Sequence, residues 1–157
     1  MIELRPPDPF VLEPGTISVF LAGSIEMGAA IDWQCRVSNA LQDLDVAVLN
    51  PRREAWDASW PQTPDFAPFR EQVEWELVAQ EAASLVIFYF APDTKSPITL
   101  LELGLNARRR SLVCCPAGYW RKGNVDMVCR HYGIPQVETL DDLIEALRRE
   151  LRGLPRT

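Results

Sequence analysis

Short, almost entirely apolar runs recur along this chain, and longer amphipathic segments separate them. The runs occupy residues 17–23, 46–50, 84–90 and 111–116, and the more polar residues 134–139 predict a short last strand. A strand that reads as a continuous apolar run is buried on both faces, which is typical of a parallel sheet covered by helices. The repeated order of strand and helix therefore predicts a single-domain α/β fold, a flavodoxin- or Rossmann-like parallel sheet of about five strands with helices on both faces.

The segments between the runs have apolar residues at helical spacing, and the predicted helices cover residues 29–44, 67–83, 98–110, 125–133 and 140–151. In the second helix, the predicted apolar face consists of Phe69, Val73, Leu77 and Ala83. Residues 1–16 are rich in proline and predict an extended arm that precedes a domain over residues 17–157.

Composition narrows the classes of function. The chain has 157 residues and a formal net charge of −6, whereas a sequence-independent binder of nucleic-acid polymers is usually basic. Four cysteines without a CxxC pair and a single histidine argue against a zinc site, and no cofactor is indicated. The chain shows no signal peptide and no apolar run long enough for a membrane helix, so we expect a cytoplasmic protein with reduced cysteines.

Ligands of parallel α/β sheets bind at the carboxyl ends of the strands. That rule directs attention to four loops, at residues 23–30, 50–66, 91–98 and 116–124. In the first loop, Gly23 and Gly28 permit a close approach of the backbone, either to a ligand or to a neighbouring helix. The loop contains neither a GxGxxG nor a GK[ST] motif, so its sequence alone leaves both readings open.

The second loop combines cationic and aromatic side chains behind Asn50. Arg52 and Arg53 are suited to clamping a phosphate or a carboxylate, and Trp56 offers a ring for stacking on a base. The alternative is that the arginines are solvated and that the tryptophan side chains only anchor the loop.

Glu102 is the most unusual charged residue of the predicted third helix, because its neighbours in the sequence are apolar: Ile98, Leu100, Leu101, Leu103 and Leu105. A glutamate in such a segment either pairs with a buried cation or serves chemistry in a pocket. Its position after the most apolar strand, at residues 84–90, adds weight to the second reading, and the residues alone leave both readings open.

Several segments together resemble the nucleoside 2-deoxyribosyltransferase-like family, which shares a superfamily with the nucleoside 5′-monophosphate N-glycosidases. The segments are FLAGSIEMG, IDWQ, LNPRREAWDASW, EQVEWE, SPITLLELG and CCPAGYWRKGNVD, and they lie within residues 17–133. The resemblance implies cleavage or transfer at the N-glycosidic bond of a small nucleoside or nucleotide, and it implies a homo-oligomer.

The resemblance also assigns roles. It makes Glu102 the nucleophile, and it places Gly23, Ser24 and Ile25 around the sugar and base. Ser96, six residues before the nucleophile, would contact the sugar or its 5′ substituent. Asn124 would reach the site of a neighbouring subunit.

The chain departs from the family pattern at two positions. Transferases of the superfamily carry aspartate at the position of Ser96, whereas the monophosphate N-glycosidases carry serine, which favours a nucleotide substrate. Many members have an aspartate at the position of Ser84 that helps to protonate the departing base. Another acid must supply this proton here, and among Asp32, Asp57 and Asp93 we expect Asp32 to do so, because it follows the first loop closely.

Three functions remain open on the sequence alone. The first is an enzyme that cleaves or transfers N-glycosidic bonds. The second is a non-catalytic module of the same fold that binds or senses a nucleotide, which the serines at positions 84 and 96 would favour. The third is a flavodoxin-like domain for another phosphorylated ligand, in which Glu102 would be dispensable.

Overall fold

The computed structural model describes residues 1–25 and 32–155, and in this part of the chain six parallel strands form one sheet. The strands lie in the order β1-β3-β2-β4-β5-β6, and every pairing is parallel. Their bounds are β1 Ile2–Leu4, β2 Ser18–Gly23, β3 Ala47–Leu49, β4 Leu85–Tyr89, β5 Ser111–Cys114 and β6 Gln136–Val137. The predicted α/β class and parallel sheet are therefore confirmed.

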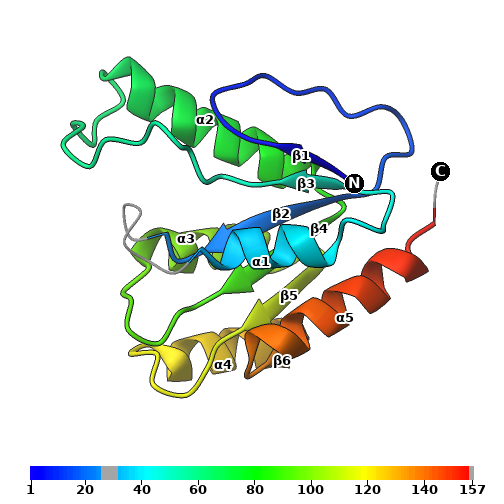
Figure 1. Cartoon of the computed structure of the whole chain (residues 1–157). Helices are drawn as coiled ribbons and strands as arrows, with labels where there is room; N and C mark the ends of the chain where they lie inside the picture. Colours follow the sequence, from blue (N-terminus) through cyan, green and yellow to red (C-terminus); the bar gives the residue numbers. More distant parts are fainter. Residues whose placement is uncertain (26–31, 156–157) are drawn as a thin grey trace.

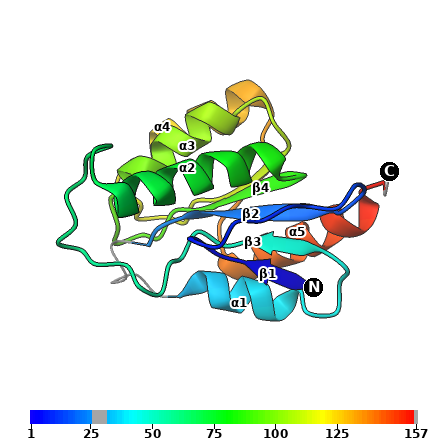
Figure 2. The same cartoon turned by 90° about the horizontal axis from the view of Figure 1, so that it is seen from above.

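Helices cover both faces of the sheet, as Figures 1 and 2 show. Helices α2, α3 and α4 lie on one face, and α1 and α5 lie on the other. Their bounds are α1 Trp33–Ala40, α2 Ala67–Ala82, α3 Pro97–Asn106, α4 Lys122–Tyr132 and α5 Leu140–Gly153. Pro97 occupies the first turn of α3, where its missing N–H leaves no intrahelical bond unmade.

Strand β1 is the main departure from the sequence analysis, which predicted about five strands and only an extended arm over residues 1–16. Ile2–Leu4 pairs in parallel with Ala47–Leu49 and forms an edge of the sheet. Farther along the arm, the Asp8 carbonyl accepts a hydrogen bond from Trp75 Nε1 at 2.9 Å. The Phe10 ring packs edge-on against Trp75. These contacts attach the arm to the sheet and to α2. A three-residue strand just before a run of prolines has too short a pattern to be predicted.

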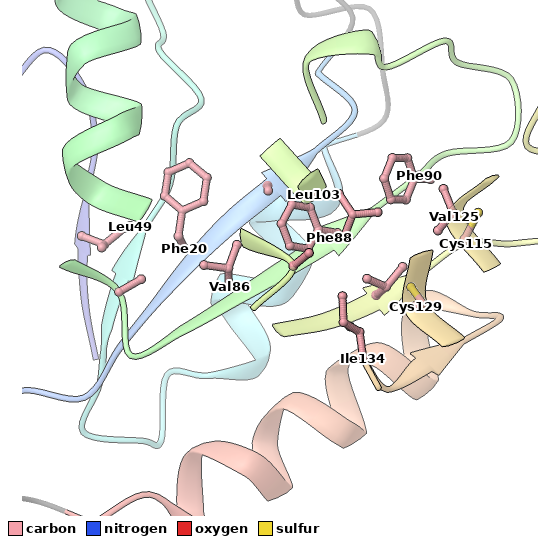
Figure 3. Close-up of a cluster of buried hydrophobic side chains, with 14 of the residues drawn as sticks. Phe20, Leu49, Val86, Phe88, Phe90, Leu103, Cys115, Val125, Cys129 and Ile134 are labelled. Atoms are coloured by element: carbon pink, nitrogen blue, oxygen red, sulfur yellow. The ribbon is translucent and has the colours of Figure 1, made fainter. Parts of the chain in front are cut away.

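Two hydrophobic clusters fill the space between the sheet and its helices. In the cluster under α2, α3 and α4, Leu103 lies beside Phe88 of β4, and Val125 and Cys129 of α4 cover Cys115 (Figure 3). The other cluster joins β2, β3 and β5 to α1 and α5. The strands supply alternate side chains to the two clusters, which explains why they read as continuous apolar runs.

Helices α2 and α3 bury polar side chains and leave large apolar ones exposed, and for α2 this departs from the predicted apolar face at Leu77. In α2 the buried residues are Gln72, Trp75, Ala79 and Gln80, whereas Leu77 is 44% exposed. In α3 the buried residues are Thr99, Glu102, Leu103 and Asn106, whereas Ile98, Leu101 and Leu105 are each about 60% exposed. Polar side chains therefore face one another between these two helices, and leucine and isoleucine face outward.

None of the helices within the described residues combines the length and the apolar composition needed to cross a membrane.

Candidate active site

Glu102 lies in the polar seam between α2 and α3, where only 8% of the residue is exposed. Its Oε1 accepts a hydrogen bond from Gln80 Nε2 at 2.7 Å. Gln80 in turn accepts a hydrogen bond from Asn106 Nδ2 at 2.6 Å. Burial and the charge of Glu76 raise the pKa of Glu102 to about 8, although the bond from Gln80 acts in the opposite direction. Glu102 is therefore buried and accepts a hydrogen bond from a neutral glutamine, and its role in chemistry stays a prediction.

Glu76 is a second carboxyl of the same seam, and the sequence analysis missed it. It lies one helical turn before Gln80 on α2, and its Oε1 accepts a hydrogen bond from Gln72 Nε2 at 2.7 Å. Desolvation of the carboxyl raises its pKa to about 7. The signal was present in the sequence, because Gln72, Glu76 and Gln80 are spaced by four residues and so share one helix face.

Three hydroxyl groups meet where β2 and β4 end. The Ser24 hydroxyl oxygen lies 2.5 Å from that of Ser96 and 2.7 Å from that of Thr94, and the last two are 2.7 Å apart. Ser96 has φ 45° and ψ 52°, a left-handed conformation that is uncommon for a non-glycine residue. Because Pro97 follows, the right-handed helical region is disfavoured at Ser96. This hydroxyl cluster lies about one and a half helical turns from Glu102 along α3.

Gly23 allows the close packing that forms this corner of the site. A Cβ at this position would lie 2.5 Å from the Trp33 ring and 2.7 Å from the Tyr89 carbonyl oxygen. Trp33 also donates a hydrogen bond from Nε1 to the Ser24 carbonyl at 3.1 Å. Of the two readings of this glycine, the structure therefore shows the structural one, a tight junction between β2 and α1. Ile25, the next predicted residue of the loop, is half-buried, and Gly28 lies outside the described residues.

The loop after β3 contains buried polar atoms without partners. Within the described part of the chain, such side-chain atoms belong to Arg52, Arg53 and Trp56 of this loop and to Gln34 and Gln72 on the helices α1 and α2. Buried polar groups are nearly always hydrogen-bonded, so a group of unpaired ones requires an explanation. A bound molecule rich in hydrogen-bond acceptors would pair with the two arginines and the indole. Gln34 and Gln72 are residues that the sequence analysis did not single out.

Comparison with known families adds to this geometry. A family model described as nucleoside 2-deoxyribosyltransferase like matches residues 16–119. This match includes Glu76, Glu102 and the hydroxyl cluster. The chain belongs to the nucleoside 2-deoxyribosyltransferase-like family. Membership supports a function related to glycosyl transfer, and the family is generally enzymatic.

A solved structure shows the same fold at low sequence identity. It is described as a conserved protein from Enterococcus faecalis V583, and it matches with a TM-score of 0.61 and 12% identity. The match covers 86% of this chain and 99% of that chain. A search of curated proteins found no match.

Asp32 and Asn50 have structural partners in this family member. Asp32 Oδ1 accepts a hydrogen bond from Cys35 N at 2.9 Å and thereby caps α1, while its Oδ2 lies 3.7 Å from Arg52 Nε. Asn50 is fully buried and donates to Glu3 Oε1 at 2.7 Å. Its own side-chain oxygen accepts from Arg52 N at 3.0 Å. A catalytic role for Asp32 and a binding role for Asn50 stay predictions, and neither side chain bonds to Glu102.

Ser84 and Asn124 lie away from this network. Ser84 stands just before β4, and its hydroxyl oxygen accepts a hydrogen bond from Ser18 N at 3.1 Å. It therefore links the amino-terminal ends of two strands. Asn124 is exposed in the first turn of α4, and its proposed reach into a neighbouring subunit's site stays a prediction.

The third and fourth loops brace each other beside the site. The Lys95 carbonyl accepts hydrogen bonds from the Tyr119 hydroxyl at 2.8 Å and from Trp120 Nε1 at 3.0 Å. Because Lys95 immediately precedes Ser96, these two aromatic residues hold the segment that carries the hydroxyl cluster.

Proposed function

We propose that this protein cleaves or transfers the N-glycosidic bond of a nucleoside 5′-monophosphate, or of a related (deoxy)nucleoside, with Glu102 as the nucleophile. The observation that carries the proposal is the carboxyl pair of the buried Glu102 and the half-buried Glu76, whose charge acts on Glu102. Two carboxyls with different partners are what the cleavage of a glycosidic bond requires: one meets the sugar, and the other exchanges a proton with the leaving group.

Glu76 is better placed than Asp32 to serve as the proton donor. Its charge acts on Glu102, and its pKa of about 7 lets it hold a proton near neutrality. Asp32 is half-exposed and already caps α1. Burial raises the pKa of both carboxyls well above the usual range of a glutamate, so the pair retains a proton near neutral pH more readily than exposed carboxyls do.

The bound substrate decides which carboxyl carries that proton. Positive charge developing on the sugar stabilises Glu102 as the carboxylate, and a basic nitrogen of the leaving base favours the protonated form of Glu76. In the first step, Glu102 attacks the anomeric carbon and the carbon–nitrogen bond breaks. The electron pair stays with the base, which takes the proton from Glu76. The product is a glycosyl ester on Glu102.

In the second step a nucleophile resolves the ester. A water molecule attacks the anomeric carbon and gives its proton to the Glu76 carboxylate, so that the free sugar leaves and both carboxyls return to their starting states. If a second base attacks in place of water, the reaction is a transfer. The two outcomes share every residue of the site, so the proposal covers both.

A 5′-phosphate is favoured over a free 5′-hydroxyl by the polar groups around the site. The hydroxyl cluster of Ser24, Thr94 and Ser96 carries no negative charge. Arg52 and Arg53 each retain a buried nitrogen without a partner among the described residues. Neutral hydroxyls and guanidinium groups suit a phosphate, whereas a carboxylate in place of Ser96 would repel it.

The test is base release from a panel of nucleosides, deoxynucleosides and their 5′-monophosphates, followed by chromatography with and without a second base. We expect release that falls by at least ~10³-fold in Glu102→Gln, a loss typical of removing a catalytic nucleophile. Glu74→Gln is the matched control, because Glu74 is an exposed glutamate of α2. It should leave the rate unchanged.

Three results separate the alternatives. Transfer of the sugar to the added base identifies a transferase, and release without transfer identifies a hydrolase. Nucleotide binding by the folded protein without any base release would refute catalysis and support the non-catalytic module.

A further inference from the structure

Glu102 is held by a chain of two neutral side chains from two helices. Asn106 Nδ2 donates to Gln80 Oε1 at 2.6 Å and to the Glu102 backbone carbonyl at 2.9 Å. Gln80 Nε2 donates to Glu102 Oε1 at 2.7 Å. Asn106 and Gln80 are each 3% exposed, so water does not compete for these bonds.

The direction of this chain follows from chemistry and does not depend on how the amide groups are drawn. A backbone carbonyl only accepts, so the Asn106 atom beside it must be the amide nitrogen. The same nitrogen contacts Gln80, whose facing atom must therefore be the oxygen. The remaining nitrogen of Gln80 then faces Glu102 and donates to it.

We propose that Gln80 and Asn106 are positioning residues, which hold the carboxyl of Glu102 through Oε1 and leave Oε2 as the oxygen that attacks the sugar. This inference rests on the proposed nucleophilic role of Glu102. Among the described residues, Oε2 has no hydrogen-bond partner, whereas Oε1 is occupied. Glu102 and Asn106 are four residues apart on α3, so the helix itself fixes their relative positions.

The arrangement also offsets the forces that would protonate the nucleophile. Among the described residues, the charged group that acts on Glu102 is Glu76 of α2, and its negative charge favours a neutral Glu102. The side chains that bond to Glu102 from α2 and α3 are neutral. The Gln80 donor is thus the contact that favours the ionised form, which is the form needed for attack.

A purely structural role would leave a different signature. Methionine has nearly the shape of glutamine, so Gln80→Met keeps the packing but removes the donor to Glu102. The replacement also removes the acceptor of Asn106, which keeps its bond to the backbone carbonyl. We expect this variant to fold with a melting temperature a few degrees below the wild-type value, because Glu102 Oε1 and one Asn106 N–H lose a buried partner.

The first experiment measures kcat, KM and their pH dependence for Gln80→Met and Asn106→Asp. We expect kcat to fall by about 10- to 100-fold. KM should stay within about threefold, because neither substitution removes a side chain that we expect to bind the substrate. In Asn106→Asp the new side chain can only accept, so the Gln80 amide must turn its oxygen toward Glu102. This variant should therefore lose at least as much rate as Gln80→Met. Gln62→Met, on an exposed loop residue, is the control and should not differ from wild type.

The second experiment does not need activity. The Glu102 carboxyl is titrated by carbon-13 NMR in wild type and in Gln80→Met, with Glu102→Gln used to assign its signal. Loss of the donor should raise the pKa of Glu102 and move the acid limb of the rate profile to higher pH.

If Gln80→Met leaves both the titration and kcat unchanged, the positioning role is refuted. If the wild type releases no base but the titration still shifts, the proposed function fails while the orienting contact stands. A lowered kcat with an unshifted titration and a much lower melting temperature would mean that Gln80 only supports the fold.

Discussion

Glu76 on α2 lies close enough to Glu102 on α3 for its charge to raise the pKa of that carboxyl. The two residues are separated by the whole of β4 and the loop after it, and each is held by a glutamine of α2. Gln72 donates to Glu76 and Gln80 donates to Glu102. This pairing gives a glutamate that looked isolated in the sequence a second carboxyl as its neighbour.

Glu76→Gln tests the proton donor. We expect base release from a natural substrate to fall by about 10²- to 10⁴-fold, because the departing base is no longer protonated. A substrate whose leaving group needs no proton, such as a nitrophenyl glycoside, should lose much less. Asp32→Asn is run beside it. If Asp32→Asn loses base release from the natural substrate but still cleaves the nitrophenyl glycoside, and Glu76→Gln does not behave in this way, Asp32 is the acid.

The stability of the protein should decrease as the pH rises from about 5.5 to 9. Burial raises the pKa of Glu102 to about 8 and that of Glu76 to about 7, both from 4.5. A folded state with raised carboxyl pKa values binds more protons than the unfolded chain, so the contribution is present below pH 4.5 and is lost as the pH passes through 7 and 8.

Denaturant unfolding at several pH values measures this loss. We expect the free energy of unfolding to fall by about 1–3 kcal/mol across the range, since one pKa unit corresponds to about 1.4 kcal/mol and the two sites are coupled. Glu102→Gln should flatten the curve. An equally steep curve in that variant would show that other groups cause the dependence.

Ser96→Asp should change the preference among substrates. An aspartate here would place a charge against the hydroxyls of Ser24 and Thr94, where we expect a 5′-phosphate. The ratio of kcat/KM for a monophosphate to that for the free nucleoside should fall by at least about tenfold. Ser96→Asn is the matched control, because asparagine has the same shape without the charge and also tolerates the left-handed conformation at this position. An equal fall in Ser96→Asn would assign the effect to shape.

Gly23→Ala should destabilise the protein by about 1–3 kcal/mol, the usual cost of overpacking a rigid site. The new methyl group would meet the Trp33 ring and the Tyr89 carbonyl oxygen at less than 3 Å. Gly104→Ala is the comparison, because a Cβ there meets nothing within 4 Å. In the helix α3 that change should be neutral or stabilising by up to about 1 kcal/mol. Equal melting temperatures for the two variants would contradict the packing argument.

The outward leucines of α3 bear on the expected homo-oligomer. Ile98, Leu101 and Leu105 form an exposed apolar stripe on α3. The polar residues of the same helix, Thr99, Glu102 and Asn106, are buried. Leu101→Asp should therefore shift the protein toward the monomer in light scattering, because the charge would be buried in an interface. Val11→Asp, at an exposed position of the arm, should leave the mass unchanged. A wild-type protein that is already a monomer would contradict the expectation.

The sequence by itself determined the class of fold. Runs such as residues 84–90 are mostly apolar because the strand is covered on both faces. This pattern can be recognised in the sequence without knowing which helices cover the strand. It also singled out Glu102, since a charged residue among leucines is unusual wherever the helix lies, and the structure shows this residue buried, whereas its catalytic role stays a prediction. The segments that resemble the family consist of consecutive residues, so the family could also be recognised from the sequence.

Tertiary structure decided which residues accompany Glu102. The apolar face predicted for α2 was wrong at Leu77, which faces outward, and it left out Gln72 and Gln80, which are buried. Polar groups can be buried when they satisfy one another, and those partners lie on another helix that no local pattern reveals. The spacing of Gln72, Glu76 and Gln80 placed Glu76 on one helix face with two glutamines, but only the packing of α2 and α3 on one sheet brings its charge close to Glu102.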